Sequence, residues 1–320
     1  MIHNPTRDVD RAEFVRRFFG FLEREGVAAA ALHGWQNGFE GELSDVDFVI
    51  EPRGFGRIAA LVHEHCQAEG WRLCQILRHE TTAAYCVCVS AAEPMQVVAL
   101  DACSDYQRNG MFFLKAAEML EGAVAMPWGG KCLNVENHLL YRVLKAAGKA
   151  KEVEQASLEF LAFPETTRAR VAERIERKWG VRIDAWDTAA MRRHLPALAK
   201  RSFSARAAVG PAALWRCVKR LFRPAGMVLL VDAGMSATPV LEQLAPLFRK
   251  CKASADPGPG LLWDLIKSTC CCVSRLPWSL RLVLNGESRV DCRGRLAGSE
   301  IIGRVVNTLH RRCLRWNDLA

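Results

Sequence analysis

Short apolar runs and amphipathic stretches succeed one another through the first 120 residues. Apolar residues recur every three or four positions over 11–25 and 57–69, which predicts two amphipathic helices. Apolar runs of six to eight residues lie between and after them, a length typical of buried strands. These runs predict strands over 27–33, 43–50, 71–77, 84–90 and 95–100. The pattern therefore indicates an α/β unit whose core is mostly sheet.

Beyond residue 125 the apolar spacing becomes helical. It predicts helices over 136–147, 152–163, 168–179, 189–200 and 212–222. After Pro224 and Gly226, a strand is predicted over 227–231, a helix over 238–250 and a loop over 252–260. The predicted fold class is α/β (α+β), with units at 1–125, 126–223 and 224–320. The middle unit is a helical segment.

Two carboxylates stand out within the second predicted strand. Asp45 and Asp47 are two positions apart, so strand geometry places both on one face. Like charges that close repel each other, unless a divalent cation offsets them. Asp101 ends the apolar run 95–100, and an adjacent strand would bring it beside the pair; Asp105 is the alternative third ligand. Three carboxylates can hold two Mg²⁺ ions, one activating a hydroxyl and one stabilising a leaving pyrophosphate.

These residues resemble the DNA polymerase β-type nucleotidyltransferase superfamily. Its pattern is an apolar residue, Gly, then Gly or Ser, a spacer, an Asp-apolar-Asp strand and a third Asp on a later strand. Here Gly34 and Trp35 precede Asp45 by a nine-residue spacer, and Trp35 departs from the usual small residue. The resemblance implies a mixed sheet, a nucleoside triphosphate substrate and Mg²⁺ or Mn²⁺. The resemblance also implies roles for residues. Asp45, Asp47 and Asp101 would bind metal, and Asp101 would also act as the base. The nucleotide would be bound by Gly34, Trp35 and Ser44.

A second resemblance covers most of the chain. Bacterial proteins linked to exopolysaccharide clusters fuse a nucleotidyltransferase-like domain to a helical segment and a thymidylate kinase-like P-loop domain. Three segments resemble theirs: 44–49, Asp101 with 110–114, and 137–145. The last contains Lys145, for which the resemblance implies a contact with nucleotide phosphate, although a solvated lysine is the alternative. His33, beside Gly34, is either a phosphate contact or a structural histidine.

The phosphate loop that the second resemblance implies is damaged. In the segment 227–244, Ala237 stands where a P-loop has its lysine. Without that lysine, the cation that meets the phosphates is gone. Val231 and Ser236 replace the two glycines, so the amide cradle for phosphates is harder to form. We therefore expect 224–320 to be a truncated, degenerate P-loop-like unit, and kinase activity is not expected.

The charge of the chain is concentrated in one region. The 320 residues contain 44 Lys and Arg against 35 Asp and Glu, and 166–225 alone contains 15 against 4. Such a region is either a solvated helix face or a surface that attracts nucleic acid or an anionic polysaccharide. No apolar run approaches the roughly 20 residues of a bilayer span. Since 1–14 also lacks the apolar core of a signal peptide, a cytoplasmic location is predicted.

Three functions follow from these features. The favoured one is a Mg²⁺-dependent nucleotidyltransferase that moves a nucleoside monophosphate from a triphosphate to a hydroxyl acceptor, with a link to exopolysaccharide biosynthesis implied by the resemblance. The alternative is a non-catalytic nucleotide-binding or scaffold pseudoenzyme, because of Trp35 and the lost P-loop. A nucleic-acid-binding module through 166–225 ranks last, because that region lacks interleaved aromatic residues.

Overall fold

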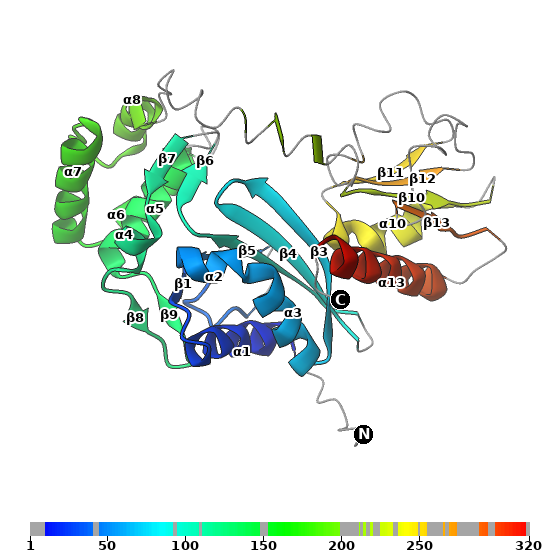
Figure 1. Ribbon diagram of the computed structural model, residues 1–320. Helices are drawn as coiled ribbons and strands as arrows, with labels where there is room; N and C mark the ends of the chain where they lie inside the picture. The colour runs from blue at the N-terminus through cyan, green and yellow to red at the C-terminus, as the bar shows by residue number, and fades with distance from the viewer. Residues whose placement is uncertain are drawn as a thin grey trace.

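A mixed seven-stranded sheet forms the centre of the computed structural model (Figure 1). The structure describes residues 10–40, 45–91, 95–108, 111–147, 153–198, Pro211, 214–215, 218–219, 225–232, 236–248, 250–254, Leu265, 269–273, 288–293 and 298–317. The predicted α/β class with a mixed sheet is confirmed. In the described part of the chain, no helix has both the length and the apolar character needed to cross a bilayer.

The strand order of the central sheet is β3-β4-β5-β2-β1-β9-β8. Its strands are β1 (Ala29–Ala31), β2 (Val46–Ile50), β3 (Trp71–Glu80), β4 (Ala83–Ser90), β5 (Val97–Cys103), β8 (Val124–Ala125) and β9 (Lys131–Cys132). The pairs β2–β5 and β1–β9 are parallel, and the other neighbours are antiparallel. Because β2 and β5 are parallel neighbours, residues in register on them project from the same face.

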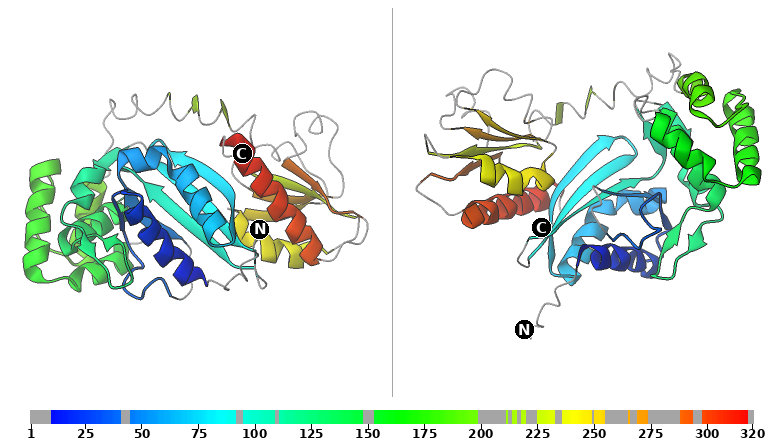
Figure 2. Two further views of the ribbon diagram at one scale, coloured as in Figure 1. Left: turned by 60° about the horizontal axis from the view of Figure 1, so that its bottom comes forward. Right: turned by 180° about the vertical axis from the view of Figure 1, so that it is seen from behind.

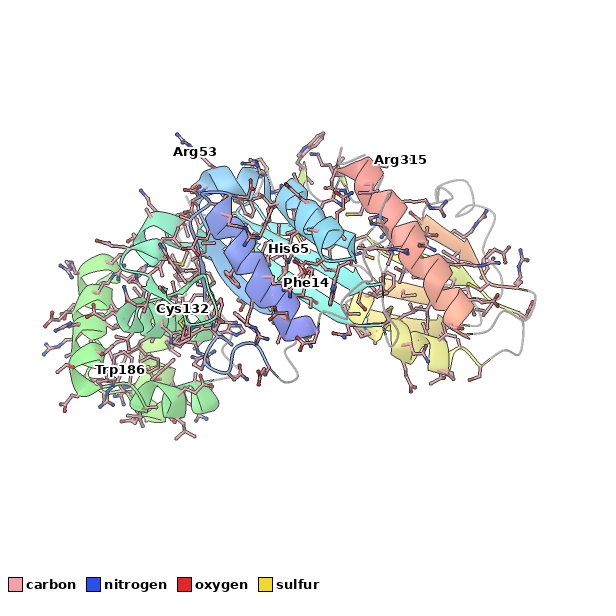
Figure 3. The ribbon with its side chains drawn as sticks, turned by 90° about the horizontal axis from the view of Figure 1, so that it is seen from below. Phe14, Arg53, His65, Cys132, Trp186 and Arg315 are labelled. Atoms are coloured by element: carbon pink, nitrogen blue, oxygen red, sulfur yellow. The ribbon has the colours of Figure 1, made fainter. Side chains whose placement is uncertain are left out.

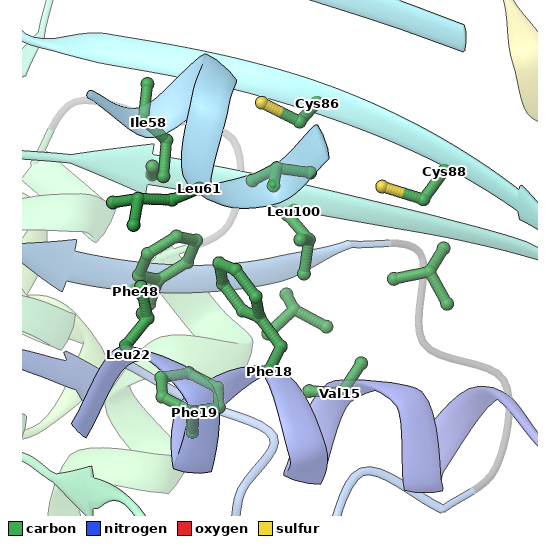
Figure 4. Close-up of a cluster of buried hydrophobic side chains, with 14 of the residues drawn as sticks. Val15, Phe18, Phe19, Leu22, Phe48, Ile58, Leu61, Cys86, Cys88 and Leu100 are labelled. Atoms are coloured by element: carbon green, nitrogen blue, oxygen red, sulfur yellow. The ribbon is translucent and has the colours of Figure 1, made fainter. Parts of the chain in front are cut away.

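One face of this sheet is covered by three N-terminal helices. These are α1 (Arg11–Arg24), α2 (Pro52–Gly56) and α3 (Ile58–Ala68). Figure 4 shows Phe18 and Phe19 of α1 against Phe48 of β2, and both ring pairs have centroids 5.7 Å apart. All three rings are almost completely buried, and each buried phenylalanine contributes about 1.5–3 kcal/mol to stability. Because this core occupies one face of the sheet, polar side chains on these strands can be accommodated only on the other face.

The opposite face is covered at its two ends by different parts of the chain. At one end lie α4 (Ala116–Leu120), α5 (Val135–Ala147), α6 (Val153–Leu161), α7 (Glu165–Trp179) and α8 (Thr188–Leu198). They share an apolar core with Val49 of β2 and Cys103 of β5. The hairpin β6 (Tyr106–Arg108) and β7 (Met111–Leu114) leads from the sheet into this layer.

At the other end lies the C-terminal unit. Within its described residues, four strands are all parallel, in the order β11-β12-β10-β13: β10 (Met227–Leu230), β11 (Lys250–Ser254), β12 (Thr269–Val273) and β13 (Arg289–Asp291). The helices α10 (Thr238–Leu244) and α13 (Gly298–Trp316) pack with β10 against Cys74 of β3 and with Val87 and Val89 of β4. Figure 2 shows this unit and the helices α5–α8 at opposite ends of the sheet in both views.

Several predicted boundaries are wrong. The helix predicted over 238–250 ends at Leu244, because Pro246 cannot continue it, and a 3₁₀ turn (η2, Ala245–Leu247) follows. The loop predicted over 252–260 begins as strand β11. The short hairpin β6–β7 was not predicted, and most of the helix predicted over 212–222 lies outside the described residues.

Candidate functional site

Two of the predicted carboxylates lie directly opposite each other on neighbouring strands. Asp47 of β2 is the register partner of Asp101 of β5, and Tyr85 of β4 is the partner of Asp101 on its other side. The residues on either side of Asp47, Val46 and Phe48, belong to the core under α1. Strand alternation therefore turns Asp47, Asp101 and Tyr85 to the face between the two covering layers.

Asp45 and His33 complete the group on the β2 side. One ligating atom each from His33, Asp45 and Asp47 lies within 4.8 Å of the others. His33 follows β1, whose pairing extends to its neighbour because the Leu32 amide donates to the Asp47 carbonyl at 2.9 Å. His33 and Asp45 are half-buried and Asp47 is buried. These three side chains offer a set of ligand atoms that fits a metal ion.

Three donors converge on one oxygen of Asp47. Lys145 Nζ lies 2.5 Å from Asp47 Oδ2, His33 Nε2 lies 2.6 Å from it, and the Tyr141 hydroxyl donates to it at 3.2 Å. Burial alone would raise the pKa of Asp47. The hydrogen bond to His33 and the charge of Lys145 outweigh burial and hold that pKa well below its usual range. Asp47 is therefore a carboxylate throughout the neutral range.

Helix α5 supplies two of these donors. Tyr141 and Lys145 are four residues apart, so they project from the same helix face. The Lys145 ammonium lies 5.6 Å from the centroid of the Tyr141 ring. Burial, followed by the charge of Asp47, raises the pKa of the Tyr141 hydroxyl, which stays protonated and donates. Packing α5 on this end of the sheet thus brings its polar face to Asp47.

Asp101 has its own neighbours on β3 and β4. His79 Nε2 lies 3.7 Å from Asp101 Oδ1, beyond hydrogen-bond distance. His79 sits where the β3–β4 register shifts between Arg78 and Glu80, and such a bulge redirects a side chain. Burial, followed by the charges of Asp45 and Asp101, raises the pKa of Tyr85 to about 12. His79 and Tyr85 therefore border the carboxylates Asp45, Asp47 and Asp101 on the side away from α5.

The loop after β1 contains two of the other predicted residues. Gly34 has a φ of 76° and Phe39 a φ of 67°, so the loop is built on left-handed backbone. Trp35 packs partly into the α1 core and lies 5.6 Å, ring to ring, from His138 of α5. Its ring is therefore part of the scaffold that joins the loop to α5. Ser44 lies outside the described residues.

The basic face of α7 is largely paired with carboxylates. Lys178 Nζ lies 2.5 Å from Glu118 Oε1, and Arg170 Nη1 lies 2.7 Å from Glu136 Oε1. Arg174 donates to the Asn137 side chain at 2.7 Å. These contacts join α7 to α4 and α5. A nucleic acid or anionic polysaccharide partner for 166–225 stays a prediction.

The sequence carried a signal for some of these neighbours but not for others. Tyr141 was not among the predicted site residues, although it lies four positions before Lys145 on a predicted helix, a spacing that places both on one face. His33 was already a candidate beside Gly34. Nothing in the sequence indicated His79, because its position depends on a bulge that arises only when β3 pairs with β4. Asp105, the alternative third ligand, accepts a hydrogen bond from the Ala116 amide at 2.8 Å, at the start of α4.

Comparisons with known proteins give a limited result. No family model matches the chain, and no curated protein matches it either. Among solved structures, the chain is similar to the antibiotic-resistance factor ANT(2'')-Ia, known from a solution structure. The match covers 65% of this chain and 99% of that one, with 13% sequence identity and a TM-score of 0.30. A likeness of this size does not assign a family.

Proposed function

We propose that this protein is a divalent-metal-dependent nucleotidyltransferase that moves a nucleoside monophosphate from a triphosphate to a hydroxyl acceptor. The observation that carries the proposal is the register of Asp47 with Asp101, together with the ligating group of His33, Asp45 and Asp47. The carboxylates lie on two parallel neighbouring strands and face the same side of the sheet, where α5 brings Tyr141 and Lys145 onto Asp47. Like charges placed together in this way destabilise a folded protein unless cations or hydrogen-bond donors compensate them.

The residues divide into two roles. Asp45 and Asp47, with Asp101 beside them, would hold the metal, and a bound ion would stabilise the charge that develops on the phosphates during transfer. Asp101 is the proposed base, because its side chain is about one-quarter exposed and so can reach an acceptor hydroxyl. Lys145 and the left-handed backbone at Gly34 are the proposed contacts for the nucleotide phosphates.

Net charge also bears on the fit to a nucleotide. A triphosphate is strongly anionic, and the carboxylates by themselves would repel it. Lys145 places its Nζ 2.5 Å from Oδ2 of the buried carboxylate Asp47. If a metal ion takes over the neutralisation of Asp47, the ammonium becomes free to pair with a phosphate oxygen. The site therefore has a cation for the nucleotide in addition to the metal.

A non-catalytic nucleotide-binding role is the second candidate. One observation favours it: Asp47 Oδ2 is already occupied by Lys145, His33 and Tyr141. A carboxylate neutralised in this way has a smaller need for a metal ion. In this second role the protein would bind a nucleotide without pyrophosphate release.

Pyrophosphate release separates the two candidates. The full chain is incubated with each of the four ribonucleoside triphosphates, Mg²⁺ or Mn²⁺, and a panel of sugar, small-molecule and protein hydroxyl acceptors. We expect metal-dependent release that falls at least roughly a hundredfold in Asp101→Asn, the range for loss of a positioned general base. Asp184→Asn, at an exposed aspartate on the loop before α8, is the matched control and should retain wild-type activity. Nucleotide binding without release in any combination would support the second candidate.

A further inference from the structure

One member of the candidate metal group is a nitrogen donor. His33 Nε2 is 2.6 Å from Asp47 Oδ2, and the ligating atoms of His33, Asp45 and Asp47 lie within 4.8 Å of one another. Around an ion with bonds of about 2.1 Å, octahedral ligands lie about 3 Å apart when adjacent and about 4.2 Å apart when opposite. The three atoms can therefore meet on a single ion after small side-chain movements.

The surroundings make His33 a defined part of this group. Its side chain is 22% exposed and that of Asp47 is 10% exposed, so the pair is shielded from bulk water. The backbone of the preceding residue, Leu32, is fixed to Asp47 by a hydrogen bond of 2.9 Å. His33 therefore cannot move far from Asp47 without breaking the extension of the β1–β2 pairing.

We propose that His33 is a direct ligand of the divalent ion, through Nε2, and that it makes the site prefer Mn²⁺ to Mg²⁺. This inference rests on the metal site of the proposed function. Carboxylate oxygens suit Mg²⁺, Ca²⁺ and Mn²⁺ alike, whereas imidazole nitrogen favours transition ions and is a poor ligand for Mg²⁺. One imidazole among two carboxylates thus shifts selectivity without excluding hard ions. In the bound form the ion would take the place of the proton on Nε2: the neutral ring would keep its one proton on Nδ1, and a second proton, if present, would pass to solvent.

The competing view is that His33 only orients Asp47 by hydrogen bonding. Both views predict weaker metal binding when His33 is changed, so affinity alone does not separate them. Direct coordination makes two further predictions. Bound Mn²⁺ must show magnetic coupling to a ¹⁴N nucleus, and the ratio of Mg²⁺ to Mn²⁺ affinity must change when the nitrogen is removed.

Pulsed electron paramagnetic resonance of Mn²⁺ on the full chain tests the inference. We expect directly coordinated ¹⁴N in the wild type and its loss in His33→Gln and His33→Ala. Competition with Mg²⁺ should show the Mn²⁺ preference falling roughly tenfold in both variants. Lys145→Met should keep the ¹⁴N coupling, which excludes the lysine as its source. His194→Gln, which changes a histidine on α8, is the matched control and should match the wild type.

The outcomes also separate this inference from the proposed function. Bound Mn²⁺ without ¹⁴N coupling in the wild type would overturn the inference, as would failure of Mn²⁺ to bind at millimolar concentration. If the coupling is present while no triphosphate is ever cleaved, the His33 ligand stands and the proposed function fails. If triphosphate is cleaved without the coupling, the proposed function stands and His33 is not a ligand.

Discussion

The ion pair between Lys145 and Asp47 should contribute measurably to the stability of the fold. Its Nζ–Oδ2 distance is 2.5 Å, and the two side chains are 20% and 10% exposed. Removing one partner of a well-buried pair costs about 3–5 kcal/mol, because the remaining charge is left uncompensated. Here His33 and Tyr141 still donate to Asp47 after Lys145 is lost. We therefore expect Lys145→Met to lower the free energy of unfolding by roughly 2 kcal/mol.

A double-mutant cycle isolates the pairwise part of this energy. The four proteins are wild type, Lys145→Met, Asp47→Asn and the double variant, measured by urea unfolding without metal. The matched control is the cycle on Lys178 and Glu118, a pair with the same 2.5 Å distance but side chains 33% and 30% exposed. We expect a coupling energy of roughly 2 kcal/mol for the first pair and below about 1 kcal/mol for the second. Equal coupling energies in the two cycles would refute the claim that burial strengthens the pair at Asp47.

Three further predictions follow from named features of the molecule. Millimolar Mg²⁺ or Mn²⁺ should raise the melting temperature of the wild type but not of Asp45→Asn, and identical metal responses would refute a metal site at this group. The His65 ring lies against the Phe14 ring (Figure 3), and its Nε2 donates to the Phe14 carbonyl at 3.1 Å. Burial lowers the pKa of His65 to about 4. As the pH drops from 6.5 to 4, the unfolded state takes up a proton at this side chain before the folded state does. The difference in free energy of unfolding between wild type and His65→Gln should therefore fall by about 3 kcal/mol over this range, and a constant difference would contradict the prediction. The chain should not phosphorylate nucleoside monophosphates, and Ala237→Lys should lower the melting temperature without creating that activity, because Ala237 is buried in the C-terminal core; kinase activity in either protein would count against a degenerate P-loop.

Much of the N-terminal fold could be predicted because local patterns carry it. The helix predicted over 11–25 is α1, and the strand predicted over 84–90 is β4, since spacing alone distinguishes the two periodicities. Strand pairing is a different matter. The parallel register that sets Asp47 against Asp101 depends on residues 54 positions apart, and no local pattern encodes it. The two-residue repeat of a strand predicted that Asp45 and Asp47 share a face, but it did not predict which strand lies beside them.

The parts that the sequence could not predict depend on tertiary packing. The apolar residues of α10 and α13 gave no indication that they would pack on β3 and β4, because any apolar face would satisfy them. Likewise, the charge of Lys145 on a predicted helix was equally consistent with solvent. Only the packing of α5 against the end of the sheet places that ammonium on Asp47. His79 depends on a bulge in the β3–β4 pairing, which is set by the register of both strands together.

The most direct test of nucleotidyl transfer follows the fate of labelled phosphate. The full chain is incubated with Mn²⁺, the acceptor panel and ATP that carries the label on either its α- or its γ-phosphate, beside Asp47→Asn and the control Asp184→Asn. We predict that the α-label becomes attached to an acceptor, that the γ-label is released in pyrophosphate, and that both signals disappear in Asp47→Asn alone. Transfer of the γ-label to an acceptor, or α-label transfer that Asp47→Asn leaves unchanged, would contradict the proposed function.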